Sequence, residues 1–167
     1  MKKTLALILT LALSLAALTG CGSKDAATKT PAENTQQTAP VQQEQSQTEK
    51  ALALINTFAT GDTDTARSLL ADGYIQHNLA YGTGADAFIG SVEYLASADV
   101  KTTVNNIRAF EDGDKVFLQT IYNFAGAGEQ VAFDIFRFDE NGKIAEHWDV
   151  METIADQSTW QNQNGKF

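Results

Sequence analysis

The hydrophobic pattern of this chain changes its period near residue 100, and this change limits the folds that the chain can adopt. Between Glu49 and Asp99, apolar residues recur at three- and four-residue spacing, which predicts amphipathic helices. Aromatic and β-branched residues then form four strand-like segments, at 100–110, 115–124, 129–138 and 143–153. Short turns rich in Gly and Asp separate these segments, so they should form an antiparallel meander. Helices followed by a meander predict an α+β domain, with a curved antiparallel sheet wrapped around the N-terminal helices.

The helical half is expected to hold three helices and one short segment of extended or irregular chain. Polar and glycine residues interrupt the apolar pattern between them, with a predicted break at Ala71-Asp72-Gly73. The expected elements are a helix over 49–60 capped by Thr48 or a neighbour, a short helix begun by Asp62 or Thr63, an extended or irregular segment at 74–78, and a helix from Ala85 to about Ala98.

The first twenty-one residues have the layout of an export signal. Lys2 and Lys3 precede an apolar run, 5–18, that is shorter than the roughly 20 residues needed to cross a bilayer. The run leads into Leu18-Thr19-Gly20-Cys21, which resembles the bacterial lipobox, where the cysteine is acylated and becomes the new N-terminus. We therefore expect a signal peptide over 1–20 and fatty acids such as palmitate on Cys21, which anchor the protein in the cell membrane or outer membrane, on the extracytoplasmic side. The alternative is an ordinary signal peptide with a stray thiol.

Residues 21–48 are expected to form a disordered tether, because this segment is rich in Thr, Gln and Ala, holds both prolines and has no hydrophobic period. Residues 49–167 are expected to form one domain, which has no cysteine and so no disulfide. Removing 1–20 takes away two lysines and no acid, so the net charge falls from −9 to −11. Together with the absence of a basic patch in the sequence, this acidity argues against nucleic acid as a partner.

The last two strands meet at Asn141-Gly142, the dipeptide that most readily takes positive φ at both positions of a two-residue turn. That turn sets a register in which Asp134 faces Asp149. Because side chains alternate along a strand, both aspartates and His147 then share one largely apolar face with Phe136. Two carboxylates and an imidazole on such a face predict a small acid/base pocket.

A longer turn predicts a different pairing, and the sequence leaves both open. A three-residue loop that ends in a left-handed Gly142 would pair Asp139 with Lys143. Asp134 would then lie against Trp148, and the two aspartates would no longer oppose each other. We favour the two-residue turn and its register.

Four stretches of the sequence carry a resemblance to a known family. They are Tyr74-Ile75-Gln76-His77-Asn78, the strand 134–138, the run 142–150 with its Glu-His-Trp-Asp, and the closing 164–167. Together they resemble the SnoaL-like proteins, which belong to the nuclear transport factor two-like superfamily of conical α+β barrels. The resemblance covers most of 49–167 and implies a conical barrel with a cavity inside. It also implies polyketide cyclase-like chemistry, in which an aspartate on the last strand is the acid/base residue, and Asp149 matches that position.

The sequence departs from its relatives at two positions near these stretches. Leu79 stands where relatives often have a proline after the His-Asn pair, and Gln119 stands where they often have a histidine. The second departure removes a titratable group from the expected pocket, so a proton relay through that position is not expected.

The resemblance and the shared face lead to one catalytic hypothesis. Asp149 takes a proton α to a carbonyl group, while His147, His77 or protonated Asp134 donates to the developing enolate oxygen. Two opposed carboxylates do not both ionise cheaply, so one of the two should have a raised pKa. The alternative is structural, with Asp149 tied to His77 or to a backbone amide. The residues expected to line the ligand site are His77, Tyr74, Gln119, Phe136 and Tyr122.

Two classes of function follow, an acid/base enzyme of the cyclase or isomerase kind and a non-catalytic ligand-binding or envelope interaction domain. Both take a small apolar ligand as partner and neither needs a cofactor. A metal site is not expected, because the spacing of His77, His147, Asp134 and Asp149 matches no metal-binding signature. A homodimer is a further hypothesis, formed through an outer stripe of Ile144, Trp148 and Val150.

Overall fold

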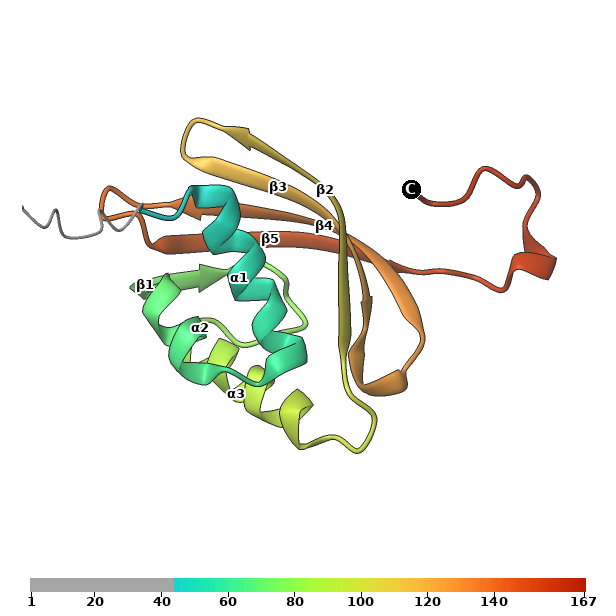
Figure 1. The fold of residues 1–167 in the computed structure, drawn as a ribbon, viewed down its shortest axis with the longest axis horizontal. Helices are drawn as coiled ribbons and strands as arrows, with labels where there is room; N and C mark the ends of the chain where they lie inside the picture. The colour runs from blue at the N-terminus through green and yellow to red at the C-terminus, as the bar shows by residue number, and fades with distance from the viewer. Residues whose placement is uncertain (1–43) are drawn as a thin grey trace, which may run out of the picture. The chain divides into compact units, whose positions relative to one another are not determined.

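The computed structural model describes residues 44–167, and the fold of this part of the chain is shown in Figure 1. The predicted signal peptide, Cys21 and most of the predicted tether lie outside the described residues. Within 44–167 the chain forms three α-helices and five β-strands. No helix of this range is long and apolar enough to cross a membrane.

The three helices confirm the predicted helical half. Their bounds are Gln47–Thr60 for α1, Thr63–Leu69 for α2 and Ala85–Ser97 for α3. Ser46 caps α1 in a reciprocal capping box with Glu49, so the helix starts two residues earlier than expected. At the other end Gly61 takes a left-handed conformation, with φ of 74°, and its N–H closes the last turn.

The sheet has five strands in the order β1-β5-β4-β3-β2, and the helices lie against one of its faces (Figure 1). The strand bounds are Leu70–Gln76 for β1, Thr103–Asp112 for β2, Lys115–Asn123 for β3, Glu129–Phe138 for β4 and Ile144–Thr153 for β5. The last four form the predicted antiparallel meander. The sheet is curved and does not close on itself, and the α+β class is confirmed.

The sheet is antiparallel from β2 to β5, as expected, but β1 was not expected to join it and pairs with β5 in parallel. The sheet is therefore mixed. The predicted break at residues 71–73 lies inside β1, where the pairing shifts register between Leu70 and Ile75. The Asp72-Gly73 pair is thus an irregularity within a strand. Asp and Gly occur both in such irregularities and in loops, so the residue types alone do not tell the two apart.

The β4–β5 hairpin combines the turn of one predicted register with the pairing of the other. Gly142 is left-handed, with φ of 67°, and Asp139 donates its N–H to the Lys143 carbonyl, which is the three-residue loop. A register shift follows, since Phe138 pairs with Ile144 and Arg137 with Glu146. The extra residue in β5 restores the opposition of Asp134 and Asp149 that the shorter turn predicted.

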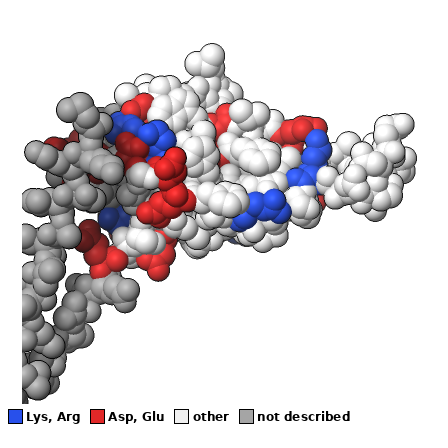
Figure 2. Space-filling model, turned by 90° about the horizontal axis from the view of Figure 1, so that it is seen from above, with Lys and Arg blue, Asp and Glu red and all other residues white. Residues whose placement is uncertain are grey.

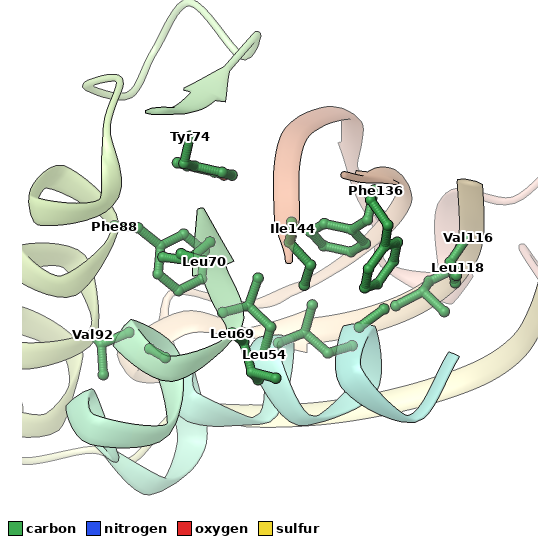
Figure 3. Packing of buried hydrophobic residues seen from close by; sticks show 14 of the residues in the cluster. Leu54, Leu69, Leu70, Tyr74, Phe88, Val92, Val116, Leu118, Phe136 and Ile144 are labelled. Carbon is green, nitrogen blue, oxygen red and sulfur yellow. The ribbon is translucent and has the colours of Figure 1, made fainter. Parts of the chain in front are cut away.

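The core lies between the helices and the inner face of the sheet (Figure 3). Leu54 and Ile55 of α1 are fully buried with Phe136 of β4 and Ile144 of β5. Ile144 was expected on an outer dimerisation stripe and lies inside instead, because the register shift in β5 turns it inward.

The outer face of the sheet carries exposed apolar side chains. Phe133 and Val150 pair across β4 and β5 and are 56% and 73% exposed. Figure 2, which views the molecule from above, shows wide uncharged areas between patches of Asp and Glu.

Candidate functional site

A cavity of about 480 Å³ opens between the helices and the inner face of the sheet. Most of its lining is apolar or aromatic, which is usual for a site that binds a small molecule. Tyr81 and Tyr94 are exposed as well as lining, so they lie at its entrance. The other lining residues are Phe58, Tyr74, Gln76, Gly82, Ala87, Phe88, Gly90, Ser91, Leu95, Tyr122, Phe124, Gln130, Asp134, His147, Asp149 and Met151.

The predicted polar cluster lies on the wall of this cavity. Asp134 of β4 and Asp149 of β5 are directly opposed, and His147 lies two residues before Asp149 on the same inner face. All three side chains line the cavity and are at least nine-tenths buried, with 4%, 5% and 7% exposure for Asp134, Asp149 and His147. The register and the period-two alternation of β5 thus bring together the groups that the sequence singled out.

Asp134 uses both of its oxygens for hydrogen bonds inside the protein. The Tyr122 hydroxyl donates to Oδ2 at 3.0 Å, and His147 Nε2 lies 3.2 Å from Oδ1. With both oxygens engaged by buried partners, the carboxylate is held in one orientation and has no oxygen left to carry a proton toward the cavity. This geometry makes Asp134 a poor proton donor, whereas the catalytic hypothesis gave protonated Asp134 as one possible donor to the enolate oxygen.

The tautomer of His147 follows from its second neighbour, Gln76. The backbone N–H of Asn78 donates to Gln76 Oε1 at 2.9 Å, so the amide nitrogen of Gln76 is the atom that faces His147 Nδ1, also at 2.9 Å. Since an amide nitrogen only donates, we assign Nδ1 as the acceptor and Nε2 as the N–H that donates to Asp134. His147 is therefore a neutral imidazole with both nitrogens occupied.

Asp149 is the member of the cluster with a free acceptor. Asn78 Nδ2 donates to its Oδ1 at 2.5 Å, whereas no side chain among residues 44–167 hydrogen-bonds to Oδ2. His147 Nε2 lies 3.8 Å from Oδ2, beyond hydrogen-bond distance. Burial raises the pKa of Asp149, and the charge of Asp134 adds a smaller push in the same direction. The expected raised pKa thus falls on Asp149, mainly through loss of water.

Tyr74 supplies a neutral hydroxyl on the same wall. Burial raises its pKa, and the nearby charges of Asp149 and Asp134 raise it further, so the phenol stays protonated. Gln76 Nε2 approaches the hydroxyl oxygen at 3.4 Å, and no acceptor within the described residues takes its proton. Tyr74, predicted as a ligand-site residue, therefore offers a free O–H donor to the cavity.

His77 was predicted to line the site, and the structure places it on the other face of the sheet. Its ring stacks on Trp148 with centroids 4.4 Å apart, and its Nε2 lies 2.9 Å from Glu146 Oε2. Glu146 also binds Arg137 on this face. His77 lies on this face because side chains alternate along extended chain, so a chain that turns Tyr74 inward turns His77 outward. The same alternation puts Trp148 opposite to Asp149, as expected.

Gln119 and Phe136 were also predicted as ligand-site residues, and neither lines the cavity. Gln119 points to the outer face, where it donates to the carbonyl of Lys166 at 2.9 Å, so the C-terminal segment covers it. Phe136 faces inward but is fully buried beneath His147, with ring centroids 4.3 Å apart. It supports the imidazole from behind. Tyr122 does line the cavity, with its hydroxyl committed to Asp134.

Sequence reasoning missed two residues that hydrogen-bond to the polar cluster, Gln76 and Asn78. Both lie in the 74–78 stretch that carried the family resemblance, and both point inward because they alternate with Ile75 and His77. The alternation alone would place Gln76 and Asn78 on the same face as Tyr74. Their contact with the cluster becomes visible only once β1 is known to be a strand paired with β5, where Gln76 lies beside His147.

One atom each of Asp134, His147 and Asp149 lie within 4.8 Å of one another, a spacing that suits a metal ion. The hydrogen bonds of the cluster do not suit one. His147 Nε2 carries the proton that a metal would have to replace, and both oxygens of Asp134 already accept hydrogen bonds. The prediction of a metal-free site stays a prediction, and the donor set favours it.

Comparisons with known proteins agree with this fold. A profile of the SnoaL-like domain matches residues 51–147. No protein with curated function matches the sequence significantly. Among solved structures, an NTF2-like protein from Cytophaga hutchinsonii is 16% identical, with a TM-score of 0.57 over 66% of this chain and 94% of that one.

Two further structures carry names that bear on chemistry. A proposed polyketide cyclase, IdmH from Streptomyces antibioticus, is 18% identical over 65% of this chain and 93% of its own, with a TM-score of 0.52. An LEH-like epoxide hydrolase from M. tuberculosis is 18% identical over 62% and 80%, with a TM-score of 0.54. At these identities the likeness is one of fold. With a family profile matching more than half of its length, the chain belongs to the SnoaL-like domain family.

Proposed function

We propose that the domain binds a small apolar carbonyl compound in its cavity and moves a proton on it, with Asp149 as the base. One observation carries this proposal. Asp149 Oδ2 lies on the wall of a mostly apolar cavity with no hydrogen bond from the described residues, while Asn78 holds the other oxygen in place. A buried carboxylate with a raised pKa and one free oxygen is suited to proton abstraction near neutral pH.

The reaction then begins with transfer of a proton from the α-carbon of the substrate to Asp149 Oδ2. The electron pair of that C–H bond moves toward the carbonyl oxygen, and the Tyr74 hydroxyl donates a hydrogen bond to the enolate that forms. Asp149 returns the proton to another carbon in an isomerisation. In an aldol-type closure the enolate carbon attacks a second carbonyl group, whose oxygen takes the proton.

The donor role passes to Tyr74 because the earlier candidates are occupied or distant. His147 has both nitrogens in hydrogen bonds, Asp134 accepts two, and His77 lies on the outer face. His147 and Asp134 are positioning residues in this account. They fix the inner face of β4 and β5 against which Asp149 is held. The names of the structural relatives, a proposed polyketide cyclase and an epoxide hydrolase, are compatible with acid/base chemistry in the same fold.

Exchange of α-protons in heavy water tests the proposal without knowledge of the natural substrate. 2-Tetralone is a suitable probe, because it is small, apolar and slowly exchanging, and proton NMR follows the loss of its α-signals. We expect the protein to accelerate exchange and Asp149→Asn to lower that rate by about a hundredfold or more. Glu140→Gln removes the same charge from an exposed turn position and should leave the rate unchanged.

The alternative function is a ligand-binding domain without catalysis, in which Asp149 serves only to recognise the ligand. The same experiment separates the two. Saturable binding of 2-tetralone with no acceleration of exchange would support the binder and would exclude proton abstraction from such ketones.

We also propose that the full chain is a lipoprotein tethered through Cys21, so that the domain works outside the cytoplasm. The support is the charged, apolar and small-residue layout of residues 1–21. Two acyl chains on one residue are sufficient for stable membrane anchoring.

A further inference from the structure

The cavity is negatively charged, and no described cation balances it. Asp134 and Asp149 both lie on its wall, and His147 between them is held as a neutral imidazole. Among residues 44–167, no lysine or arginine lines the cavity. Because the side chains of both aspartates are at least nine-tenths buried and water screens buried charges less, a bound ligand meets a field that favours positive charge.

Three of the described cations have partners outside the cavity. Arg137 pairs with Glu146 on the outer face, Lys166 pairs with Glu152, and Lys143 donates to the Ser68 carbonyl. These partners hold the side chains away from the cavity. An anionic ligand would therefore enter the cavity without a counter-charge from the described residues.

Aromatic rings form much of the remaining wall. We define the aromatic wall as Phe58, Tyr74, Phe88, Tyr122 and Phe124, which contact one another with centroids between 4.9 and 6.4 Å and all line the cavity. Figure 3 shows two of its members, Tyr74 and Phe88, side by side at one end of the core. The face of an aromatic ring is electron-rich and attracts an organic cation, by about 2 kcal/mol where water is excluded.

From these two features we infer that the carbonyl compound bound in the cavity is an organic cation, with a protonated amine on its apolar ring or chain. Its apolar body packs on the aromatic wall, and the charge of Asp149 attracts its ammonium group. Asp149 Oδ2, which the described residues leave free, stays open to the α-proton of the same ligand. A neutral compound of the same shape binds through the aromatic wall alone. A carboxylate or phosphate of the same shape is repelled by both aspartates.

This inference rests on one half of the proposed function, that the cavity is the ligand site, and does not depend on proton transfer. Binding of probes without turnover therefore tests it separately. If the protein prefers cationic probes but does not accelerate the exchange of ketone protons, the inference about the ligand stands and the proposal of proton transfer by Asp149 fails.

Three naphthalene probes of matched shape test the charge preference by isothermal titration calorimetry on the full-length chain. They are 1-naphthylmethylammonium, 1-naphthylmethanol and 1-naphthoate. We expect the ammonium to bind at least about tenfold tighter than the alcohol, and the carboxylate to bind weaker than the alcohol. Equal binding of ammonium and alcohol, tighter binding of the carboxylate, or no binding of any probe at millimolar concentration would each overturn the inference.

Two variants locate the preference within the cavity. Asp149→Asn should bind the ammonium no tighter than the alcohol, while its affinity for the alcohol stays as in the unmodified chain. Glu140→Gln lowers the net negative charge by the same amount at an exposed turn and should keep the tenfold preference. A preference that survives Asp149→Asn, or that Glu140→Gln also removes, would show that the charge of the whole domain and not this carboxylate selects the ligand.

Discussion

Asp134 and Asp149 face each other across two strands, yet their carboxylates have different surroundings. Asp134 accepts from Tyr122 and His147, whereas within residues 44–167 Asp149 accepts only from Asn78 and keeps one oxygen free toward the cavity. Burial dominates the raised pKa of Asp149, and the neighbouring Asp134 contributes less. One carboxylate therefore stabilises the fold, and the other remains available for a ligand.

This difference predicts unequal effects of two equivalent substitutions on stability. Asp134→Asn places an amide N–H₂ against the Tyr122 hydroxyl or against His147, so a buried donor loses its acceptor. We expect a loss of about 2–4 kcal/mol in the free energy of unfolding, measured by urea titration. Asp149→Asn keeps an oxygen that accepts from Asn78, so its free energy of unfolding should fall by much less. Equal losses for the two variants would contradict the assigned roles.

Residue types and alternation were enough to predict Asp134, His147 and Asp149 as one cluster, because they lie on neighbouring strands of one hairpin. His77 was misplaced, although Tyr74 and His77, three positions apart, fall on opposite faces of any regular strand. Gln76 and Asn78 were missed for a different reason. Their contacts with His147 and Asp149 join residues 71 positions apart, and single-sequence periodicity carries no information about such pairings.

At the scale of elements, β1 and the β4–β5 hairpin position the site. The helices and the meander follow from local pattern, since the apolar period and turn residues predict each of them. The parallel pairing of β1 with β5 does not, because strands distant in sequence form it. In the hairpin the favoured pairing is confirmed although the predicted turn was wrong. The register shift in β5 compensates for the longer loop, and no local signal at Ile144 or Glu146 marks it.

The contact between α1 and α3 leads to a prediction at Gly61. A side chain there would combine φ of 74° with a Cβ only 2.8 Å from the Cβ of Ala96, so Gly61→Ala should lower the free energy of unfolding by about 1–3 kcal/mol. Gly90→Ala is the matched control, because Gly90 lies inside α3 with open space around it. That variant should be stabilised by about 0.5–1 kcal/mol. Chemical denaturation of both measures the contrast, and a neutral Gly61→Ala would contradict this packing.

At the scale of the whole molecule, the domain is acidic on its surface and in its cavity, with eight lysines and arginines against nineteen aspartates and glutamates in 44–167. This charge keeps such a domain away from anionic lipid headgroups and draws cationic ligands toward it. The apolar outer face, with Phe133 and Val150, is compatible with the homodimer hypothesis without Ile144. The mass of the protein in solution tests that hypothesis.

The proposed tether leads to a prediction about the entire chain. Expressed in bacterial cells, the protein should incorporate a palmitate analogue and sediment with membranes, because two acyl chains give stable anchoring. Cys21→Ser should abolish the labelling. The variant chain should then no longer sediment with membranes through a lipid, whether or not its signal peptide is cleaved. Labelling that persists in Cys21→Ser would contradict lipidation at this residue.

The titration of Asp149, followed by NMR of carboxyl-labelled aspartate and assigned by comparison with Asp149→Asn, tests most directly whether the cavity holds a base poised for proton transfer. Since burial raises its pKa, Asp149 remains partly protonated at pH values where an exposed aspartate is fully ionised. Its ionised fraction, and with it the rate of 2-tetralone exchange, should rise with pH through that raised pKa. A carboxyl signal that titrates above the ordinary aspartate value and is missing in Asp149→Asn is the predicted result. Titration of Asp149 at or below that value would contradict it.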